Sequence, residues 1–308
     1  MRLRVATISL LVLLAPHRGG AQVPVPPAAA QNPSPMVEHT RAHERLEPHD
    51  LPGAHRSFTG PLDKPVDVFV PAGVHANRAI DLVIAFHGAP FIPDYAVSRM
   101  RGTFVAVTLT LGTGSGVYDR AFREPAVFDT LVASIRREIG DALGRAPDLG
   151  SITLVGYSAG HGAVRAILRD SAHFERVDAV LLLDGLHTSY VPEGTVLEKG
   201  GALDTTNLVA FERFARDAMR GSKRFLVTHS EIFPGTFAST TETTDWLVQA
   251  LGLHRAPVVR WGPRGMQQLS EVRSGHFQIM GFAGNSAPDH VDQFQALPEM
   301  LERLWSRR

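Results

Sequence analysis

The sequence predicts an α/β fold: a doubly wound, mostly parallel sheet with helices on both faces. From about residue 57, strand-like apolar runs alternate with amphipathic helical segments up to the end of the chain. The run Ile80–Phe86 is apolar on both faces after Asp81, which is typical of a central strand covered on both sides. Strands separated by helices are joined by right-handed crossovers, so neighbouring strands are expected to be parallel.

The elements follow each other in a regular order. Val66–Val70 alternates like a strand, and Pro71–Gly73 turns the chain toward the central run. The expected later elements are strands at Phe104–Leu109, Ser151–Val155, Val177–Leu183 and Arg224–Thr228, a last strand between Leu269 and Phe282, and helices at Glu124–Leu143, Ala159–Arg169, Asn207–Arg220, Thr241–Leu251 and His290–Trp305. No internal repeat is visible.

Composition limits the kinds of partner. The chain has 308 residues with 44% hydrophobic content, enough for a sizeable core. Lys plus Arg and Asp plus Glu both number 31, so no overall field attracts nucleic acid or an anionic membrane. We therefore expect a small or weakly charged substrate, and the oligomeric state is left open. The absence of cysteine excludes a thiolate nucleophile and Cys-ligated zinc.

The N-terminus predicts export. Basic residues at 1–4 precede a short apolar run at 5–15, and small residues at 19–21 supply a cleavage site, so residues 1–21 are predicted to be a signal peptide. The apolar run is too short to span a membrane. Residues 22–56 form a predicted linker and N-terminal extension, Pro- and Ala-rich in its first part, and residues 57–308 form the predicted domain. The mature protein is expected in the periplasm or outside the cell.

The densest chemical signal is a G-x-S-x-G motif, Gly156-Tyr-Ser158-Ala-Gly160. It lies where a buried strand pattern stops and a helical pattern starts. Such a turn holds the serine in a strained conformation, and the flanking glycines remove Cβ atoms that would collide with the neighbouring strand and helix. We expect Ser158 to be a nucleophile at the carboxyl edge of the sheet, with backbone N–H groups of the following helix directed at a developing oxyanion.

The order of strands and helices, His87-Gly88 after an early central strand, and Gly156-Tyr-Ser-Ala-Gly160 resemble the α/β-hydrolase superfamily. The resemblance covers about residues 57–308. The stretches Val68–Gly73 and Leu82–Gly88 are also similar to secreted bacterial esterases, including polyhydroxybutyrate-depolymerase-like and feruloyl-esterase-like enzymes.

An acyl-transfer site needs two donors for the oxyanion, and backbone N–H groups are the usual solution. Ala159, directly after the nucleophile, is one expected donor. The resemblance implies that the other comes from the loop after His87-Gly88, at Ala89.

The general base should follow the last strand of the sheet, which leaves two of the 14 histidines. If Phe277–Phe282 is the last strand, His290 opens the terminal helix in the position of the base. If the strand ends near Val272, the base is His276. We favour His290 because the Pro288-Asp289 helix start leaves no room for another strand after it.

The acid has two candidates. Asp184 ends the buried strand Val177–Leu183, where a charge needs partners, and a triad imidazole is the natural one. Glu231 follows the next strand, the commoner position in the superfamily. We favour Asp184 because the glycine after it marks the turn more clearly.

Together these residues predict a serine hydrolase that cleaves a carboxylic ester through an acyl-enzyme, with Ser158, His290 and Asp184 in the catalytic roles. The alternatives are a peptidase or amidase, and an inactive hydrolase-fold binding protein. The loop from Leu186 to Asp204 is a candidate for the pocket wall. Neither a cofactor nor a metal is expected, because no metal-ligand spacing such as H-E-x-x-H occurs.

Overall fold

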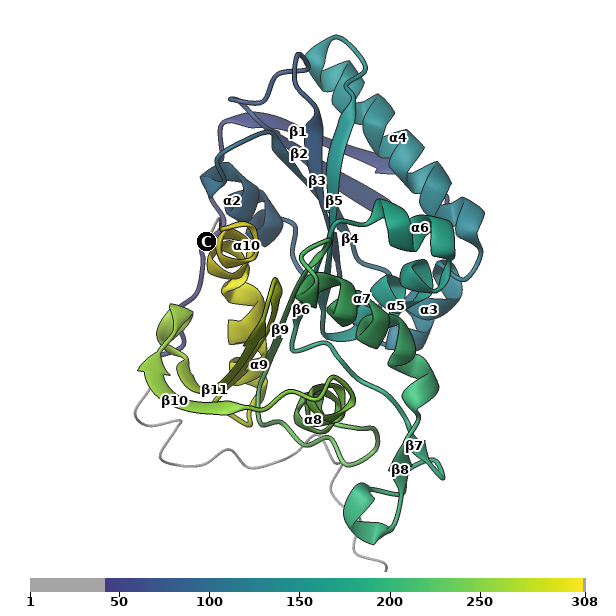
Figure 1. Ribbon diagram of the computed structural model, residues 1–308. Helices are drawn as coiled ribbons and strands as arrows, with labels where there is room; N and C mark the ends of the chain where they lie inside the picture. The colour runs from purple at the N-terminus through teal and green to yellow at the C-terminus, as the bar shows by residue number, and fades with distance from the viewer. Residues whose placement is uncertain (1–41, 307–308) are drawn as a thin grey trace, which may run out of the picture.

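The computed structural model describes residues 42–306. Its core is one ten-stranded sheet in the order β1-β2-β4-β3-β5-β6-β9-β12-β11-β10 (Figure 1). The strands are β1 Gly53–Thr59, β2 Pro65–Pro71, β3 Ile80–Phe86, β4 Phe104–Leu109, β5 Leu149–Tyr157, β6 Ala179–Leu183, β9 Arg224–His229, β10 Ala256–Trp261, β11 Gln267–Ser274 and β12 Phe277–Phe282. From β4 to β12 all neighbours are parallel, and both ends of the sheet are antiparallel.

Helices cover both faces of this sheet, so the expected α/β architecture is confirmed. The helices are α2 Phe91–Arg99, α3 Ser115–Ala121, α4 Pro125–Leu143, α5 His161–Arg169, α6 Ser171–Arg176, α7 Val209–Met219, α8 Thr240–Ala250, α9 Ala287–Gln295 and α10 Leu297–Trp305. In Figure 1, α4, α5 and α7 lie on one side of the sheet, and α2 and α10 lie on the other. A two-stranded ribbon, β7 Tyr190–Val191 with β8 Ala202–Leu203, projects from the loop after β6.

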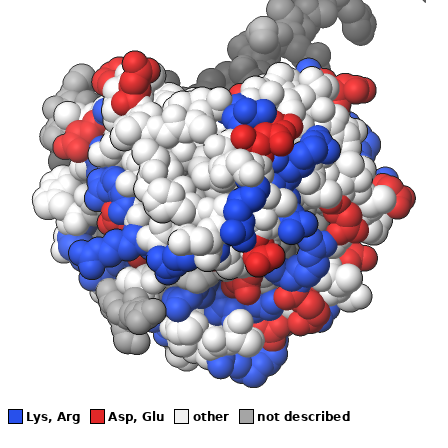
Figure 2. Space-filling model, turned by 90° about the horizontal axis from the view of Figure 1, so that it is seen from above, with Lys and Arg blue, Asp and Glu red and all other residues white. Residues whose placement is uncertain are grey.

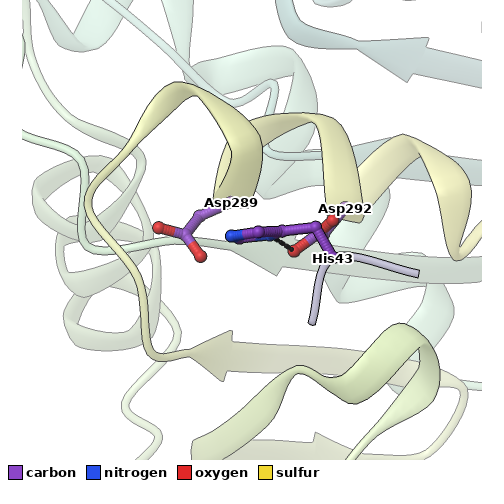
Figure 3. A group of neighbouring side chains, drawn as sticks. All are labelled: His43, Asp289 and Asp292. Carbon is purple, nitrogen blue, oxygen red and sulfur yellow. Dashed lines mark hydrogen bonds and ion pairs between the residues drawn. The ribbon is translucent and has the colours of Figure 1, made fainter. Parts of the chain in front are cut away.

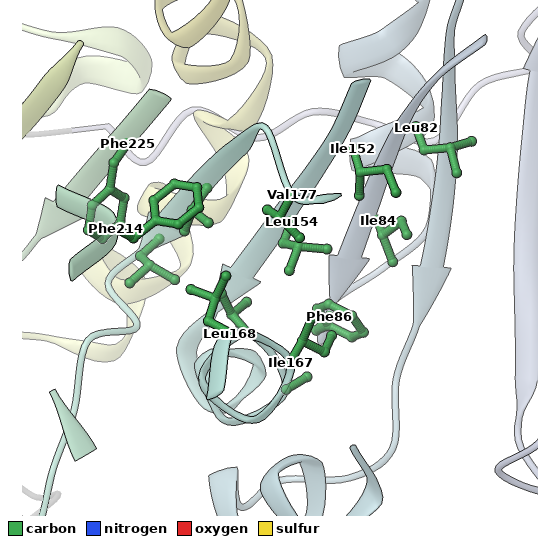
Figure 4. Close-up of a cluster of buried hydrophobic side chains, with 14 of the residues drawn as sticks. Leu82, Ile84, Phe86, Ile152, Leu154, Ile167, Leu168, Val177, Phe214 and Phe225 are labelled. Carbon is green, nitrogen blue, oxygen red and sulfur yellow. The ribbon is translucent and has the colours of Figure 1, made fainter. Parts of the chain in front are cut away.

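The two faces bury separate hydrophobic clusters, and β3 contributes to both. Leu82, Ile84 and Phe86 pack in the larger cluster with Leu154 and with the helices α4, α5 and α7 (Figure 4). Val83 and Ala85, which alternate with them, pack against α2 and the C-terminal helices. Each large side chain buried in this way stabilises the fold by about 1.5–3 kcal/mol. The two-sided apolar run therefore becomes a central strand.

The structure differs from the expected elements at the ends of the sheet. The sheet begins with β1 at Gly53, four residues before the expected domain start at residue 57, and β1 pairs with β2. The single strand expected between Leu269 and Phe282 is a hairpin, β11 and β12, and β10 adds a further edge strand. The helix α2 was not expected either.

On the face seen in Figure 2, Lys and Arg side chains lie beside Asp and Glu side chains, and a broad uncharged area lies between the charged groups. Within residues 42–306, none of the helices is long and apolar enough to cross a membrane. The predicted signal peptide at 1–21 and most of the predicted linker lie outside the described residues.

Candidate active site

Ser158 sits on a tight turn between β5 and α5. Its φ is 48°, in the left-handed region that costs a non-glycine residue free energy. A Cβ on Gly160 would overlap the carbonyl oxygen of Phe86, the last residue of β3, so only glycine lets the turn lie this close to the neighbouring strand. A Cβ on Gly156 would lie 3.0 Å from the Cα atom of His161. The motif's glycines therefore allow the close approach that the sequence predicts.

His290 and Asp184 meet at the same edge of the sheet. Asp184 directly follows β6, and His290 lies in the first turn of α9, just after β12. The Nδ1 atom of His290 is 2.8 Å from Oδ2 of Asp184. Because an ionised carboxylate only accepts hydrogen bonds, Nδ1 carries the proton and Nε2 of the neutral ring is an acceptor. A Cβ on Gly185 would lie 3.1 Å from the backbone N of Ser158, so the acid's own turn packs against the serine turn.

Three donors besides His290 hold the Asp184 carboxylate. The backbone N–H of Ser230 donates to Oδ1 at 3.0 Å, its hydroxyl donates to Oδ2 at 2.6 Å, and the hydroxyl of Thr240 donates to Oδ1 at 2.7 Å. Burial alone would raise the pKa of Asp184, but these hydrogen bonds and His290 hold it well below its usual range. The carboxylate is therefore ionised at neutral pH. Sequence reasoning missed Ser230 and Thr240, which carry no motif.

The alternative base and acid lie elsewhere. His276 is in the turn between β11 and β12, and Phe277 beside it pairs with Phe225 near the start of β9. In a parallel pair this places His276 at the amino edge of the sheet, opposite the edge where Ser158 follows β5. Glu231 is exposed, and it exchanges hydrogen bonds with the backbone of Gly284. The structure thus brings Asp184 and His290 together, whereas their catalytic roles remain predictions.

The loop after β3 lies beside the serine turn. His87 and Gly88 both have positive φ, 74° and 114°, and Phe86 before them contacts Gly160. The chain therefore turns sharply at the carboxyl end of β3, and Ala89 follows within this turn. Since β3 and β5 are neighbours, Ala89 and Ala159 belong to the same edge of the sheet.

Tyr157, the residue before the serine, packs against His290 and His87. Its ring stacks on that of His290 with centroids 4.8 Å apart, on Phe294 at 4.7 Å and on His87 at 5.7 Å. The orientation of the His290 imidazole is thus defined on one face by Tyr157 and at Nδ1 by Asp184. The sequence does not predict this stacking by Tyr157, because the G-x-S-x-G motif allows any amino acid directly before the serine.

A cavity of about 540 Å³ opens at Ser158. Its walls include Ala159 and His161 from the serine turn, and His187 and Thr188 from the loop after β6. The segment Leu186–Asp204 therefore contributes to the pocket wall, as expected. Burial lowers the pKa of His161 well below its ordinary value, so this imidazole is neutral.

A separate cluster combines His43, Asp289 and Asp292, whose potential ligand atoms all lie within 4.8 Å of one another (Figure 3). The partners of its acids are protein groups. Asp292 pairs with Nδ1 of His43 at 2.8 Å and also with Arg45, and Asp289 accepts from the hydroxyl of Ser286 at the start of α9. The cluster anchors the N-terminal segment to α9, and the expectation that the protein needs no metal stays a prediction.

The sheet and the residues at its carboxyl edge together define the fold. A mostly parallel sheet carries a serine turn after one central strand, an acid after the next, and a histidine after the last parallel strand, in the chain order Ser, Asp, His. The chain has the α/β-hydrolase fold. The resemblance inferred from the motifs is thereby confirmed for the fold.

The chain matches no protein-family model and no curated protein. Among solved structures, it is similar to the feruloyl esterase module from Clostridium thermocellum, with 13% identity, a TM-score of 0.47, and coverage of 86% of this chain and 96% of that one. It is also similar to an S-formylglutathione hydrolase from Agrobacterium tumefaciens, with 11% identity, a TM-score of 0.44, and coverage of 83% and 96%.

Proposed function

We propose that the protein is a serine hydrolase that cleaves carboxylic esters through an acyl-enzyme. The observation that supports this proposal best is the 2.8 Å pair of His290 and Asp184 at the sheet edge where the strained Ser158 turn lies. Strained non-glycine backbone persists where the surrounding structure enforces it, and such sites are often functional. The fold alone would not carry the proposal.

In this mechanism, the Ser158 hydroxyl attacks the ester carbonyl carbon while Nε2 of His290 takes its proton. Asp184, ionised and hydrogen-bonded to Nδ1, keeps the ring in the productive tautomer and stabilises the imidazolium that forms. The imidazolium then gives its proton to the alkoxide as the bond between the carbonyl carbon and the alkoxide oxygen breaks. The acyl group remains bound to Ser158 as an acyl-serine. Water, activated by the same imidazole, releases the acid and restores Ser158.

Negative charge develops on the carbonyl oxygen in each half of the reaction. The N–H groups of Ala159 and Ala89 are the proposed donors to it, from the turns after β5 and β3. One such preorganised donor typically lowers the barrier by about 3 kcal/mol. An ester is the preferred substrate because an alkoxide leaves with less need of a proton than an amide nitrogen does.

Labelling with a fluorophosphonate and hydrolysis of 4-nitrophenyl acetate test the proposal in one set of variants. The purified wild type should label stoichiometrically and hydrolyse the ester, whereas Ser158→Ala and His290→Ala should lose both activities. His276→Ala is the matched control, because it removes the alternative histidine from the opposite edge, and it should behave like the wild type.

Two results would contradict the proposal. A folded wild type that neither labels nor hydrolyses would favour a hydrolase-fold binding protein. Efficient labelling combined with faster cleavage of 4-nitroanilides than of 4-nitrophenyl esters would favour a peptidase or amidase.

A further inference from the structure

The cavity beside Ser158 has a polar lining. Besides Ser158, six of its residues carry a hydroxyl or amide group: Thr113, Ser115, Thr188, Ser189, Asn207 and Thr236. Among the described residues of the lining, Phe237 is the one with a large apolar side chain. Most small-molecule pockets are lined predominantly by apolar side chains, so this cavity favours a substrate with polar groups beyond the scissile bond.

Arg165, on α5, supplies a buried cation to the cavity wall, and its side chain is 10% exposed. Its Nε and Nη2 atoms both lie 2.8 Å from Oδ2 of Asp119. Its Nη1 atom has no hydrogen-bond partner among residues 42–306. Because a guanidinium carries five N–H donors, Arg165 retains donor capacity at the cavity.

Arg165 shares its carboxylate partner with two other cations. Asp119 is shared by three guanidinium groups: Arg165, Arg123 at 3.3 Å and Arg169 at 3.2 Å. Side chains of Arg123 and Arg169 are 70% and 44% exposed, so water screens them, whereas Arg165 is buried beside the cavity. The single carboxylate of Asp119 is therefore divided among three cations and offsets the charge of Arg165 only in part.

The other titratable groups nearby leave this charge in place. Glu193 also lines the cavity, but it is exposed to solvent. Asp204 attracts Arg165 electrostatically, but its carboxylate oxygens accept hydrogen bonds from Thr206 and Asn207. His161, between Arg165 and the serine turn, is neutral for the reason given above.

We propose that the substrate carries a carboxylate a short distance from its scissile ester, and that Arg165 binds this carboxylate inside the cavity. The inference rests on the proposed ester hydrolysis and specifies its substrate class. A hydrogen bond between a guanidinium and a carboxylate is stronger than one between neutral groups, and it gains further in a site partly shielded from water. Arg165 is then a specificity-determining residue.

Two pairs of esters that differ in one negative charge test this substrate class. Mono-4-nitrophenyl adipate and its methyl ester place the charge in the acyl part, and 4-acetoxybenzoate and its methyl ester place it in the alcohol part. For the wild type, the ratio of kcat/KM between charged and neutral esters should favour the charged one in one pair. In Arg165→Gln this ratio should fall about 10- to 100-fold. Each ratio compares the same two esters, so differences in their chemical reactivity cancel between variants.

Arg123→Gln is the matched control. It removes another guanidinium from Asp119 at a side chain that is 70% exposed and does not line the cavity, and it should keep the wild-type ratios. Unchanged ratios in Arg165→Gln for both pairs, or an equal fall in Arg123→Gln, would overturn the inference.

A measurement on the wild type covers the case in which Arg165→Gln does not fold. Adipate or 4-hydroxybenzoate should inhibit hydrolysis of 4-nitrophenyl acetate competitively, whereas adipamide and 4-hydroxybenzamide should inhibit at least about tenfold more weakly. Equal inhibition by acids and amides would overturn the inference. In that event, continued hydrolysis of neutral esters would leave the proposed serine hydrolase activity intact, so the two failures are distinguishable.

Discussion

Among residues 42–306, three of the five non-glycine residues with positive φ lie at the sheet edge that carries the candidate site. Ser158, Asp184 and His87 are non-glycine residues with positive φ, and each directly follows a parallel strand, β5, β6 or β3. Such a conformation costs on the order of 1–3 kcal/mol per residue. It turns the chain sharply out of the sheet at the carboxyl edge. Of these three turns, a sequence motif predicts only the one at Ser158. The strained conformations of Asp184 and His87 depend on neighbours that are distant in the sequence.

Replacing Asp184 with Asn tests its charge. The variant should lose about 10³- to 10⁴-fold in kcat, since an amide no longer enforces the Nδ1–H tautomer of His290. It should also unfold more easily at pH 7 by about 3 kcal/mol, because buried donors lose their charged acceptor. Activity assays and urea unfolding measure the two effects.

The pH dependence of that stability difference follows from the lowered pKa of Asp184. In the unfolded chain an Asp titrates near pH 4, so the stabilisation by the ionised form is complete above that pH. It is lost as the pH falls from about 4 toward the folded-state pKa. The difference between wild type and Asp184→Asn should therefore be constant from pH 8 to pH 5 and shrink in more acid solution. A difference that grows on acidification would contradict the assignment.

At the scale of elements, the N-terminal segment, residues 42–52, holds the helix that carries His290. Arg45 pairs with the fully buried Asp292 of α9, and its Nη2 donates to the carbonyl of Pro288 at 3.1 Å. The N–H of Leu46 donates to the side chain of Gln295 at 2.7 Å. These contacts span the length of α9, so the segment contributes to the position of the base.

Arg45→Ala should loosen α9. We expect a loss of about 1–3 kcal/mol in stability, since a buried carboxylate loses an ion-pair partner. Amide hydrogen exchange should accelerate within α9 and remain unchanged in α4. Arg56→Ala is the matched control, because Arg56 pairs with Glu138 of α4 at 3.0 Å, far from α9 in the sequence. Unchanged exchange in α9 of the Arg45 variant would show that the segment does not support the helix.

Sequence patterns predict the elements in the middle of this sheet better than those at its ends. The strands β3, β5 and β6 are buried on both faces, and their apolar runs are unambiguous. In β10, five of the six residues are exposed, so no apolar pattern marks the strand. Only two residues, Gly275 and His276, separate β11 from β12. In the sequence, the two strands of this hairpin therefore look like one continuous segment. Pro93 within α2 weakens its helical signal.

At the scale of the whole molecule, the candidate site is assembled from the segments that follow three parallel strands, β5, β6 and β12. Ser158 could be predicted from its motif because the turn is encoded locally. The choices of His290 over His276 and of Asp184 over Glu231 stayed open, because they depend on which strand is last and on the register of distant strands. In the structure, β12 pairs with β9 as the last parallel strand, and His290 contacts Asp184. These two observations show which histidine and which acid lie together.

Export is a further prediction at this scale, based on the N-terminal sequence alone. When the full chain is expressed in a bacterial host, the protein should be recovered from the periplasm or medium with its N-terminus at Gln22. N-terminal sequencing and mass spectrometry measure this directly. Deleting residues 2–21 should leave the protein in the cytoplasm. Recovery of the uncleaved full chain in the cytoplasm would contradict the prediction.

The most direct test of the central claim is to locate the covalent adduct that a fluorophosphonate forms on the wild-type protein. Proteolysis and tandem mass spectrometry should assign one phosphonyl group per chain to Ser158 and none to other serines, including Ser115 and Ser189 in the cavity wall. An adduct at another serine, or no adduct on a folded protein, would contradict Ser158 as the nucleophile.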